Sequence, residues 1–218
     1  MSILRKIHGV PSSPYVRKIR VMMAEKGLEY DLVPVFPFGA GKEFRKLSPL
    51  GKIPVLEEDG YVLPDSSAIA EYLEAAYPDV PLFPKDPKER GTAVFLEEFG
   101  DSGLAEKGTG AIFFQRIVAP RFLGRPTDEE VVARAIDKDM PRLLDYLEGL
   151  LADGRQFLVG GAFSIADIAV ATQFVNMKFG GYIVDAARWP KTADYIARIH
   201  GRPSFAKLVA EEEAMFAG

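Results

Sequence analysis

The chain of 218 residues contains no cysteine and only two histidines, His8 and His200. The absence of cysteine excludes disulfides, thiolate metal sites and any redox mechanism that uses the protein's own sulfur. Two imidazoles are too few to make a transition-metal site expected. We therefore expect a protein without a metal.

Long apolar runs and an excess of basic charge are also missing. No run approaches the roughly 20 residues that a membrane span requires. The first six residues become charged at Arg5 and Lys6, before a signal-peptide core could form, so we expect a cytosolic protein without a membrane partner. The formal net charge of −4 argues against nucleic acid as a partner, because phosphate binding needs a basic excess.

One segment divides the sequence, because proline recurs at every third position at Pro78, Pro81, Pro84 and Pro87. Proline at this spacing cannot continue a helix and favours an extended backbone of limited flexibility. We predict a first domain over residues 1–80, a linker over 81–87 and a second domain over 88–218.

The residues before the linker mix strand and helix patterns. Strands are predicted over residues 3–8, 29–34, 53–56 and 61–63, and the last two flank the hairpin signal Asp59-Gly60. Helices are predicted over residues 14–26, closed by Gly27, and over residues 66–76, with a short helix within residues 39–48. The predicted order is β-α-β, a connection, then β-β-α.

The residues after the linker show helical patterns almost throughout. These patterns cover residues 88–100, 110–118, 127–151, 164–178 and 190 to the end. A bundle of helices that buries its apolar stripes is therefore predicted for the second domain.

Ser13 and Pro14 stand where the first strand passes into the first helix. Serine is a common N-cap and proline a common first helical residue, which is a purely structural interpretation. A hydroxyl there also lies beside free backbone N–H groups and the positive end of the helix dipole, an environment that stabilises an anion. The two interpretations are compatible. A hydrolase serine fits poorly, because there is no G-x-S-x-G turn.

Two further junctions combine proline with polar residues. Pro54 lies just inside an apolar strand start, and a cis bond before it would leave the backbone of Ile53 free to pair with an extended ligand. From local sequence alone a trans turn is the expected form. Asp65 and Ser66 lead into the helix at residues 66–76, either as plain caps or as groups that hold the ammonium and carboxylate of an amino-acid-like ligand.

Five segments in this order resemble the soluble glutathione transferases over essentially the whole chain. They read S-x-x-x-R-K-I-R from Ser13, E-K-G-L-E-Y, S-P-L-G-K-I-P-V-L, D-S-S-A-I-A-E-Y-L and, in the helical half, F-S-I-A-D. The resemblance implies an α/β thioredoxin-like N-terminal domain followed by an all-α C-terminal domain. It also implies an enzyme that conjugates the thiolate of glutathione to a small hydrophobic electrophile, with glutathione as co-substrate, no other cofactor, and a homodimeric state.

The resemblance also implies roles for particular residues. Ser13 is expected to activate the thiol, with Ser12 as a close rival. A cis bond is expected before Pro54, with the backbone of Ile53 pairing with the cysteinyl part of glutathione. The γ-glutamyl end is expected to contact Asp65 and Ser66, and the glycyl carboxylate is expected to contact Lys52. The candidates for contact with the electrophile are Tyr15, Phe113, Phe114, Arg116 and Phe122. Aromatic residues at such spacings are more often part of a hydrophobic core.

This chain departs from some members of that family. The class that isomerises maleylacetoacetate carries a cysteine inside its serine motif, where this chain has Pro14 and Tyr15. Cysteine-dependent members are excluded by composition. Two alternatives stay open from the sequence: a non-catalytic binding or interaction protein that keeps the fold, and a glutathione-dependent peroxidase or dehalogenase.

The segment around Ser164 gives a first prediction. Serine at an N-cap with an acidic residue, Asp167, three positions on is close to a capping box, and Phe163 and Ile168 occupy the positions of a hydrophobic staple. We expect Ser164→Ala to lower the free energy of unfolding by about 1 kcal/mol, because it removes a cap. Thermal denaturation measures this, and a variant that melts at the wild-type temperature contradicts it.

Overall fold

The computed structural model describes residues 4–38 and 41–216. The chain divides into two compact units, Met1–Leu82 (unit 1) and Phe83–Gly218 (unit 2), and the division falls within the proline-rich segment. Among the described residues no helix is long and apolar enough to cross a membrane.

Unit 1 is built on a mixed sheet of four strands in the order β2-β1-β3-β4. β1 (Arg5–His8) is parallel to β2 (Asp31–Val33), while β3 (Val55–Glu58) is antiparallel to both β1 and β4 (Tyr61–Pro64). The turn between β3 and β4 consists of Asp59 (φ 47°) and Gly60 (φ 85°), so the hairpin predicted from this pair is confirmed. The thioredoxin-like arrangement expected for this domain is present.

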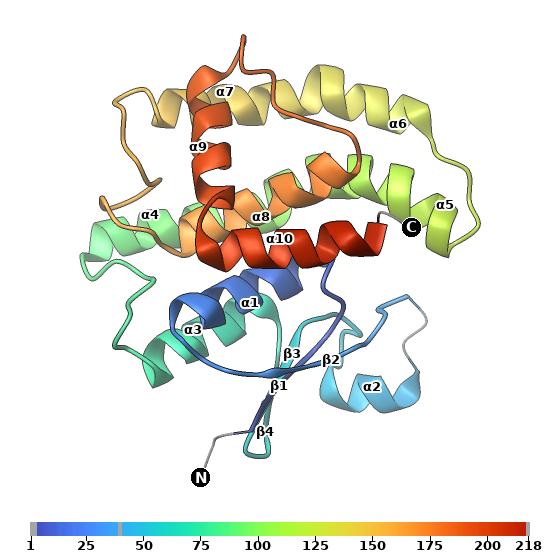
Figure 1. Cartoon of the computed structure of the whole chain (residues 1–218), viewed down its shortest axis with the longest axis vertical. Coiled ribbons are helices and arrows are strands. Elements are labelled where there is room, and N and C mark those ends of the chain that lie inside the picture. The colour runs from blue at the N-terminus through green and yellow to red at the C-terminus, as the bar shows by residue number, and fades with distance from the viewer. Residues whose placement is uncertain (1–3, 39–40, 217–218) are drawn as a thin grey trace. The chain divides into compact units, whose positions relative to one another are not determined.

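Three helices accompany the sheet, and α1 (Pro14–Glu25) and α3 (Ser66–Ala76) lie side by side on one of its faces (Figure 1). α1 begins at Pro14, directly after the extended N-cap Ser13, and the chain leaves it through Gly27 (φ +67°). α3 has the bounds predicted from sequence. α2 (Lys42–Leu47) is the short helix expected in the polar stretch before Ser48.

A buried lysine fixes the proline-rich segment to unit 1. The Lys26 ammonium donates to Glu74 Oε2 at 2.8 Å, to the Tyr77 carbonyl at 2.9 Å and to the Val80 carbonyl at 2.7 Å. Glu74 also accepts the backbone N–H of Leu82. All three ammonium donors are therefore used, and the chain is held in place as far as Leu82.

A second buried charge network lies at the hairpin end of the sheet. Arg5 Nε donates to Glu58 Oε1 at 2.6 Å, and both side chains are buried. The hydroxyls of Tyr72 and Tyr77 donate to the same carboxylate. Burial opposes ionisation of Glu58, but the hydrogen bonds from Tyr72, Tyr77 and Arg5 prevail and hold its pKa below the usual value.

All regular elements in the described part of unit 2 are helices, as predicted. Its elements are α4 (Pro87–Glu98), the π-helical segment η1 (Phe99–Val118), α5 (Ala119–Phe122), α6 (Glu129–Arg134), the π-helical segment η2 (Ala135–Asp139), α7 (Met140–Leu150), α8 (Ile165–Phe179), α9 (Pro190–His200) and α10 (Pro203–Phe216). Nearly every side chain of α8 is buried, so this helix forms the centre of the unit.

The structure differs from the sequence prediction at three places in unit 2. One is α5, because residues 119–122 were not predicted to be helical. Residues 101–109 were not predicted to be helical, yet η1 runs through them. A Cβ on Gly100 would lie 2.7 Å from the Ala169 carbonyl oxygen, and one on Gly108 would lie 2.4 Å from Met177 Sδ, so these glycines admit close packing against α8. The single helix predicted from residue 190 onward is instead interrupted at Gly201, and Pro203 begins α10.

The predicted cap at Ser164 is confirmed as a capping box with Asp167. Asp167 Oδ2 accepts the Ser164 N–H at 2.9 Å, while Oδ1 accepts the Leu158 N–H at 2.9 Å and the Tyr195 hydroxyl at 2.8 Å. Burial raises the pKa of Asp167, against the opposing effect of these hydrogen bonds. One carboxylate therefore joins the loop before α8, the start of α8, and α9.

The Arg5–Glu58 network predicts how unit 1 responds to acid. Glu58→Gln should lower the free energy of unfolding by about 3–5 kcal/mol at neutral pH, because it leaves the Arg5 charge buried without its counter-ion. The wild-type contribution is complete above the unfolded glutamate pKa of about 4.3 and is lost as the pH falls through that value toward the lower folded pKa. The variant should therefore lose less stability on acidification.

Urea unfolding between pH 7 and pH 3, followed by circular dichroism, measures both effects. Glu43→Gln is the matched control, because Glu43 pairs with Lys46 but its side chain is 84% exposed. We expect the control to stay within about 0.5 kcal/mol of wild type. Equal stability of the Glu58 and Glu43 variants at pH 7 contradicts the interpretation.

Candidate functional site

The strand register brings three chain junctions to one edge of the sheet. His8, the last residue of β1, pairs with Val55, the first residue of β3, and Val55 pairs in turn with Pro64, the last residue of β4. The backbone N–H of Asp65 also donates to the Pro54 carbonyl at 3.3 Å. The residues that follow β1, precede β3 and follow β4 therefore lie close together. They include the predicted glutathione-site residues Ser12, Ser13, Lys52, Ile53, Pro54, Asp65 and Ser66.

Ser13 is the N-cap of α1. Its Oγ accepts the Val16 N–H at 3.4 Å, and its own N–H donates to the Val10 carbonyl at 3.1 Å. No acceptor for the Ser13 hydroxyl proton exists among the described residues, so this proton is available to an external anion. Ser12 lies one residue earlier and is half-buried. Which of the two hydroxyls contacts a ligand stays a prediction.

Ile53 has unpaired backbone groups at the junction that precedes β3. The Ile53–Pro54 peptide bond is cis, as the family resemblance implied. Within the part of the chain that the structure describes, neither the N–H nor the carbonyl of Ile53 makes a hydrogen bond. Unpaired backbone groups next to a strand start can accept an extended peptide as an additional strand.

Asp65 and Ser66 form the third junction. Asp65 Oδ1 accepts the Ser67 N–H at 3.0 Å and the Ala68 N–H at 3.1 Å, which caps α3. The second carboxylate oxygen and the Ser66 hydroxyl have no partner in the described ranges. Asp65 also has φ 82°, a conformation that non-glycine residues rarely adopt and that is more frequent at functional sites. The cap is thus present, and polar atoms remain for a ligand.

Two residues that support this site, Gly9 and Ser48, were given no role of their own from the sequence. A Cβ on Gly9 would lie 2.4 Å from Val16 Cγ2, so only glycine lets the strand end approach Val16 this closely, while the 3.5 Å distance to Ile53 Cβ would be an ordinary contact. The sequence signal that could have identified Gly9 is its position between a predicted strand and the cap of the following helix. The Ser48 hydroxyl binds the backbone of Lys52, whose side chain is exposed and makes no ion pair among residues 4–38 and 41–216.

The residues predicted for the electrophile are spread over three elements. Tyr15 is half-buried in α1, whereas Phe113, Phe114 and Arg116 belong to η1. The Phe113 ring is buried and meets the Phe216 ring edge-on at 6.0 Å. Arg116 donates to the Gly180 carbonyl and to Glu129, each at 3.1 Å. Phe113 and Arg116 therefore have structural contacts inside unit 2, and their role toward an electrophile stays a prediction.

Phe122, the remaining candidate, belongs to α5, and its side chain is 51% exposed. Exposure leaves room for contact with a ligand but does not identify one.

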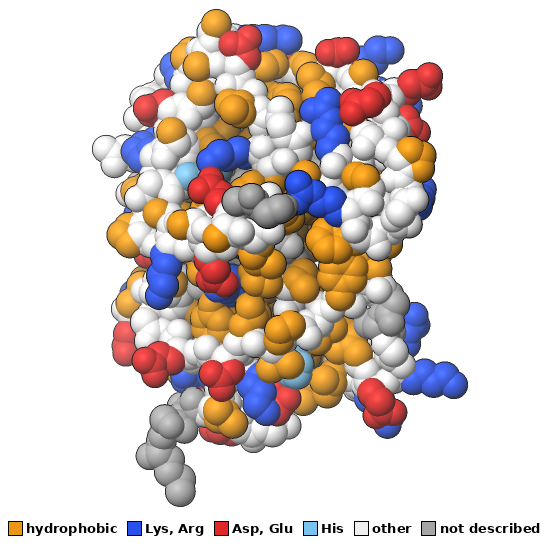
Figure 2. All heavy atoms as spheres, turned by 45° about the vertical axis from the view of Figure 1, so that its right-hand side comes forward, with side chains coloured by type: hydrophobic (Ala, Val, Ile, Leu, Met, Phe, Trp, Pro, Cys, Tyr) orange, Lys and Arg blue, Asp and Glu red, His pale blue; other side chains and the backbone are white. Residues whose placement is uncertain are grey.

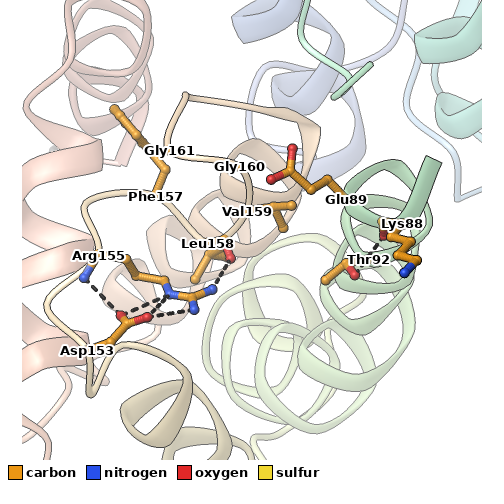
Figure 3. Close-up of a pocket in the computed structure, with 10 residues that line it drawn as sticks. All are labelled: Lys88, Glu89, Thr92, Asp153, Arg155, Phe157, Leu158, Val159, Gly160 and Gly161. Atoms are coloured by element: carbon orange, nitrogen blue, oxygen red, sulfur yellow. Dashed lines mark hydrogen bonds and ion pairs between the residues drawn. The ribbon is translucent and has the colours of Figure 1, made fainter. Parts of the chain in front are cut away.

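Unit 2 has a cavity of about 430 Å³ between the start of α4 and the loop at residues 153–161 (Figure 3). Arg155 makes a paired contact with Asp153 and also donates to the Leu158 carbonyl at 3.0 Å. This guanidinium lowers the pKa of Asp153 to about 2. The Thr92 hydroxyl donates to the Lys88 carbonyl. None of the predicted site residues lines this cavity, and much of its polar lining is bonded internally.

On the face shown in Figure 2, basic and acidic side chains are interspersed and neither sign gathers into a patch. Within the described ranges, no group of three or more histidine, aspartate or glutamate side chains could hold a metal ion.

Comparison with known proteins gives one consistent family. A glutathione S-transferase N-terminal domain model matches residues 7–81, and a glutathione S-transferase C-terminal domain model matches residues 129–198. The uncharacterized GST-like protein YibF of Escherichia coli is 31% identical over 210 residues, which cover 93% of this chain and 96% of that protein.

Two crystal structures extend the likeness to three dimensions. A glutathione S-transferase from Rhodospirillum rubrum has a TM-score of 0.85 at 29% identity, covering 94% of this chain and 91% of that one. A glutathione S-transferase from Methylobacterium radiotolerans, solved in complex with glutathione sulfonate, has a TM-score of 0.76 at 32% identity and covers 94% of each chain.

The close approach at Gly9 gives a prediction about the scaffold of the site. Gly9→Ala should lower the free energy of unfolding by about 1–3 kcal/mol, because the new methyl group overlaps the stiff Val16 side chain. Val16→Ala removes that overlap. The double variant should therefore be more stable than the sum of the two single effects predicts. Urea unfolding of the four proteins measures the coupling, and strictly additive effects contradict it.

Proposed function

Because the chain belongs to the glutathione S-transferase family, we propose that it is an enzyme that joins the sulfur of glutathione to a small hydrophobic electrophile. The single observation that carries the proposal is the set of unpaired polar groups at one edge of the sheet. The Methylobacterium radiotolerans relative, which was solved with a glutathione derivative, supports the same ligand class.

These groups match the tripeptide in type and order. The free oxygen of Asp65 and the Ser66 hydroxyl suit the ammonium and carboxylate of the γ-glutamyl end. The backbone N–H and carbonyl of Ile53 suit the peptide groups of the cysteinyl residue. The Lys52 ammonium suits the glycyl carboxylate. In this arrangement the sulfur lies on the side of Ser13.

The proposed role of Ser13 is to keep the sulfur ionised. A glutathione thiol with a pKa near the ~8.5 of cysteine is only a few per cent thiolate at neutral pH. Lowering the pKa by about two units requires about 2.7 kcal/mol. A hydrogen bond to a charged acceptor supplies about 1.5–3 kcal/mol, and a helix N-terminus adds about 0.3–1 kcal/mol. One hydroxyl at the start of α1 is therefore sufficient without a protein base.

The reaction proposed for a halide substrate is a substitution. The thiol proton leaves to water when glutathione is bound and ionised. A sulfur lone pair then forms the carbon–sulfur bond, and the carbon–halogen bond breaks with its electron pair, releasing halide. Ser13 donates its hydrogen bond throughout and is not consumed.

Ser13→Ala should raise the pKa of bound glutathione by about one to two units, because the thiolate loses its hydrogen-bond donor. The lost helix cap should cost only about 1 kcal/mol of stability, so the variant is expected to fold. The thiolate absorbance of the complex, titrated against pH, measures the shift. Ser12→Ala is the matched control and should titrate as wild type.

Three outcomes contradict parts of this proposal. A shift in the Ser12 variant alone reverses the assignment between the two hydroxyls. Wild-type titration in both variants excludes a serine mechanism. If the wild-type protein binds glutathione but forms no conjugate with a panel of aryl halides, epoxides and peroxides, the chain is a glutathione-binding protein and not a transferase.

A further inference from the structure

Ser48 closes the loop that leads from α2 into the site. Its hydroxyl donates to the Lys52 carbonyl at 2.8 Å and accepts the Lys52 N–H at 3.0 Å. Its backbone N–H donates to the Phe44 carbonyl at 2.9 Å, and its carbonyl accepts the Gly51 N–H at 2.8 Å. Ser48 is 1% exposed. One buried residue thus joins the end of α2 to both backbone polar groups of Lys52.

Little else holds this loop in place. Pro49 is exposed and Leu50 is 76% exposed, so the loop buries almost no apolar surface of its own. Gly51, at φ +66°, makes the turn that brings Lys52 back to Ser48. The loop conformation therefore depends mainly on hydrogen bonds, and two of them come from a single hydroxyl.

The same two bonds decide what the loop offers to a ligand. They occupy the N–H and the carbonyl of Lys52, whereas the backbone groups of the next residue, Ile53, make no hydrogen bond among the described residues. They also fix the direction in which the Lys52 side chain leaves the backbone. Only a group that donates and accepts at once can do this, which a hydroxyl does and a methyl group does not.

We propose that Ser48 is a positioning residue for glutathione, which acts through Lys52 and Ile53 without touching the tripeptide. This inference rests on the proposed function. Ser48→Ala should weaken glutathione binding about tenfold, equivalent to about 1.4 kcal/mol. At saturating glutathione kcat should stay within about twofold of wild type, and the pKa of the bound thiol should not change, because Ser13 is untouched.

Calorimetry with glutathione and steady-state kinetics measure these values. Ser48→Thr retains the hydroxyl and should bind within about threefold of wild type. Ser102→Ala is the matched control, because the Ser102 hydroxyl also donates to a backbone carbonyl, that of Glu98, but far along the chain in η1. In a Lys52→Ala background the effect of Ser48→Ala should shrink, since the two residues act on the same contact.

Several results overturn the inference. The inference is wrong if Ser48→Ala binds glutathione with wild-type affinity, or if Ser48→Thr loses as much affinity as Ser48→Ala. It is also wrong if the losses of affinity from Ser48→Ala and Lys52→Ala are fully additive. If Ser48→Ala does not fold, amide hydrogen exchange on the wild-type protein decides. The Lys52 amide should exchange more slowly than the Leu50 amide, because the Leu50 amide has no acceptor within the described residues. Equal exchange rates would show that the Ser48 hydroxyl does not hold Lys52.

The failure of this inference differs from the failure of the proposed function. A wild-type protein that does not bind glutathione at millimolar concentration removes the function, and the inference with it. A wild-type protein that binds glutathione together with a Ser48→Ala variant of equal affinity removes only the role of Ser48.

Discussion

The pairing of His8 with Val55 and of Val55 with Pro64 is the constraint on which the site depends. These two pairings lie at the same end of the sheet. The segments that follow β1, precede β3 and follow β4, which are distant in sequence, therefore meet there. The segment before β3 lies between the other two. A shift of one residue in either ladder would turn the polar junctions toward the opposite face of the sheet.

The two ends of this sheet are chemically different. At the hairpin end, Arg5, Glu58 and two tyrosine hydroxyls satisfy one another in a buried network. At the opposite end, backbone and side-chain groups of Ile53, Asp65 and Ser66 lack partners among the described residues. Unpaired polar groups cost stability unless water or a ligand satisfies them. Buried networks such as the one at the hairpin end compensate for the unpaired groups at the other end, since proteins that break local rules at functional sites recover the stability elsewhere.

The sequence predicted what depends on local chemistry. The helix that starts at Ser66 has a cap residue, Asp65, and a regular apolar period, and its predicted and observed bounds agree. Residues 101–109 of η1 were not predicted to be helical, because helix propensity counts against Gly103 and Gly108. The packing of Gly108 against Met177 of α8 is visible only in three dimensions. The Tyr195 hydroxyl on Asp167 was also beyond local patterns, since it joins two helices.

The site residues divide in the same way. Ser13 and Asp65 could be proposed because serine and aspartate at element boundaries have recognisable local roles. The cis bond before Pro54 was implied by the family resemblance, whereas the local sequence favours a trans turn. Gly9 and Ser48 could not be proposed, because their importance comes from what they exclude or hold, and not from any group they present to a ligand.

A serine hydroxyl does not titrate near neutral pH, so in the proposed mechanism the pH dependence of thiolate formation belongs to glutathione itself. In that mechanism the protein contributes geometry and a fixed dipole, and it needs no cysteine because glutathione carries the sulfur that reacts.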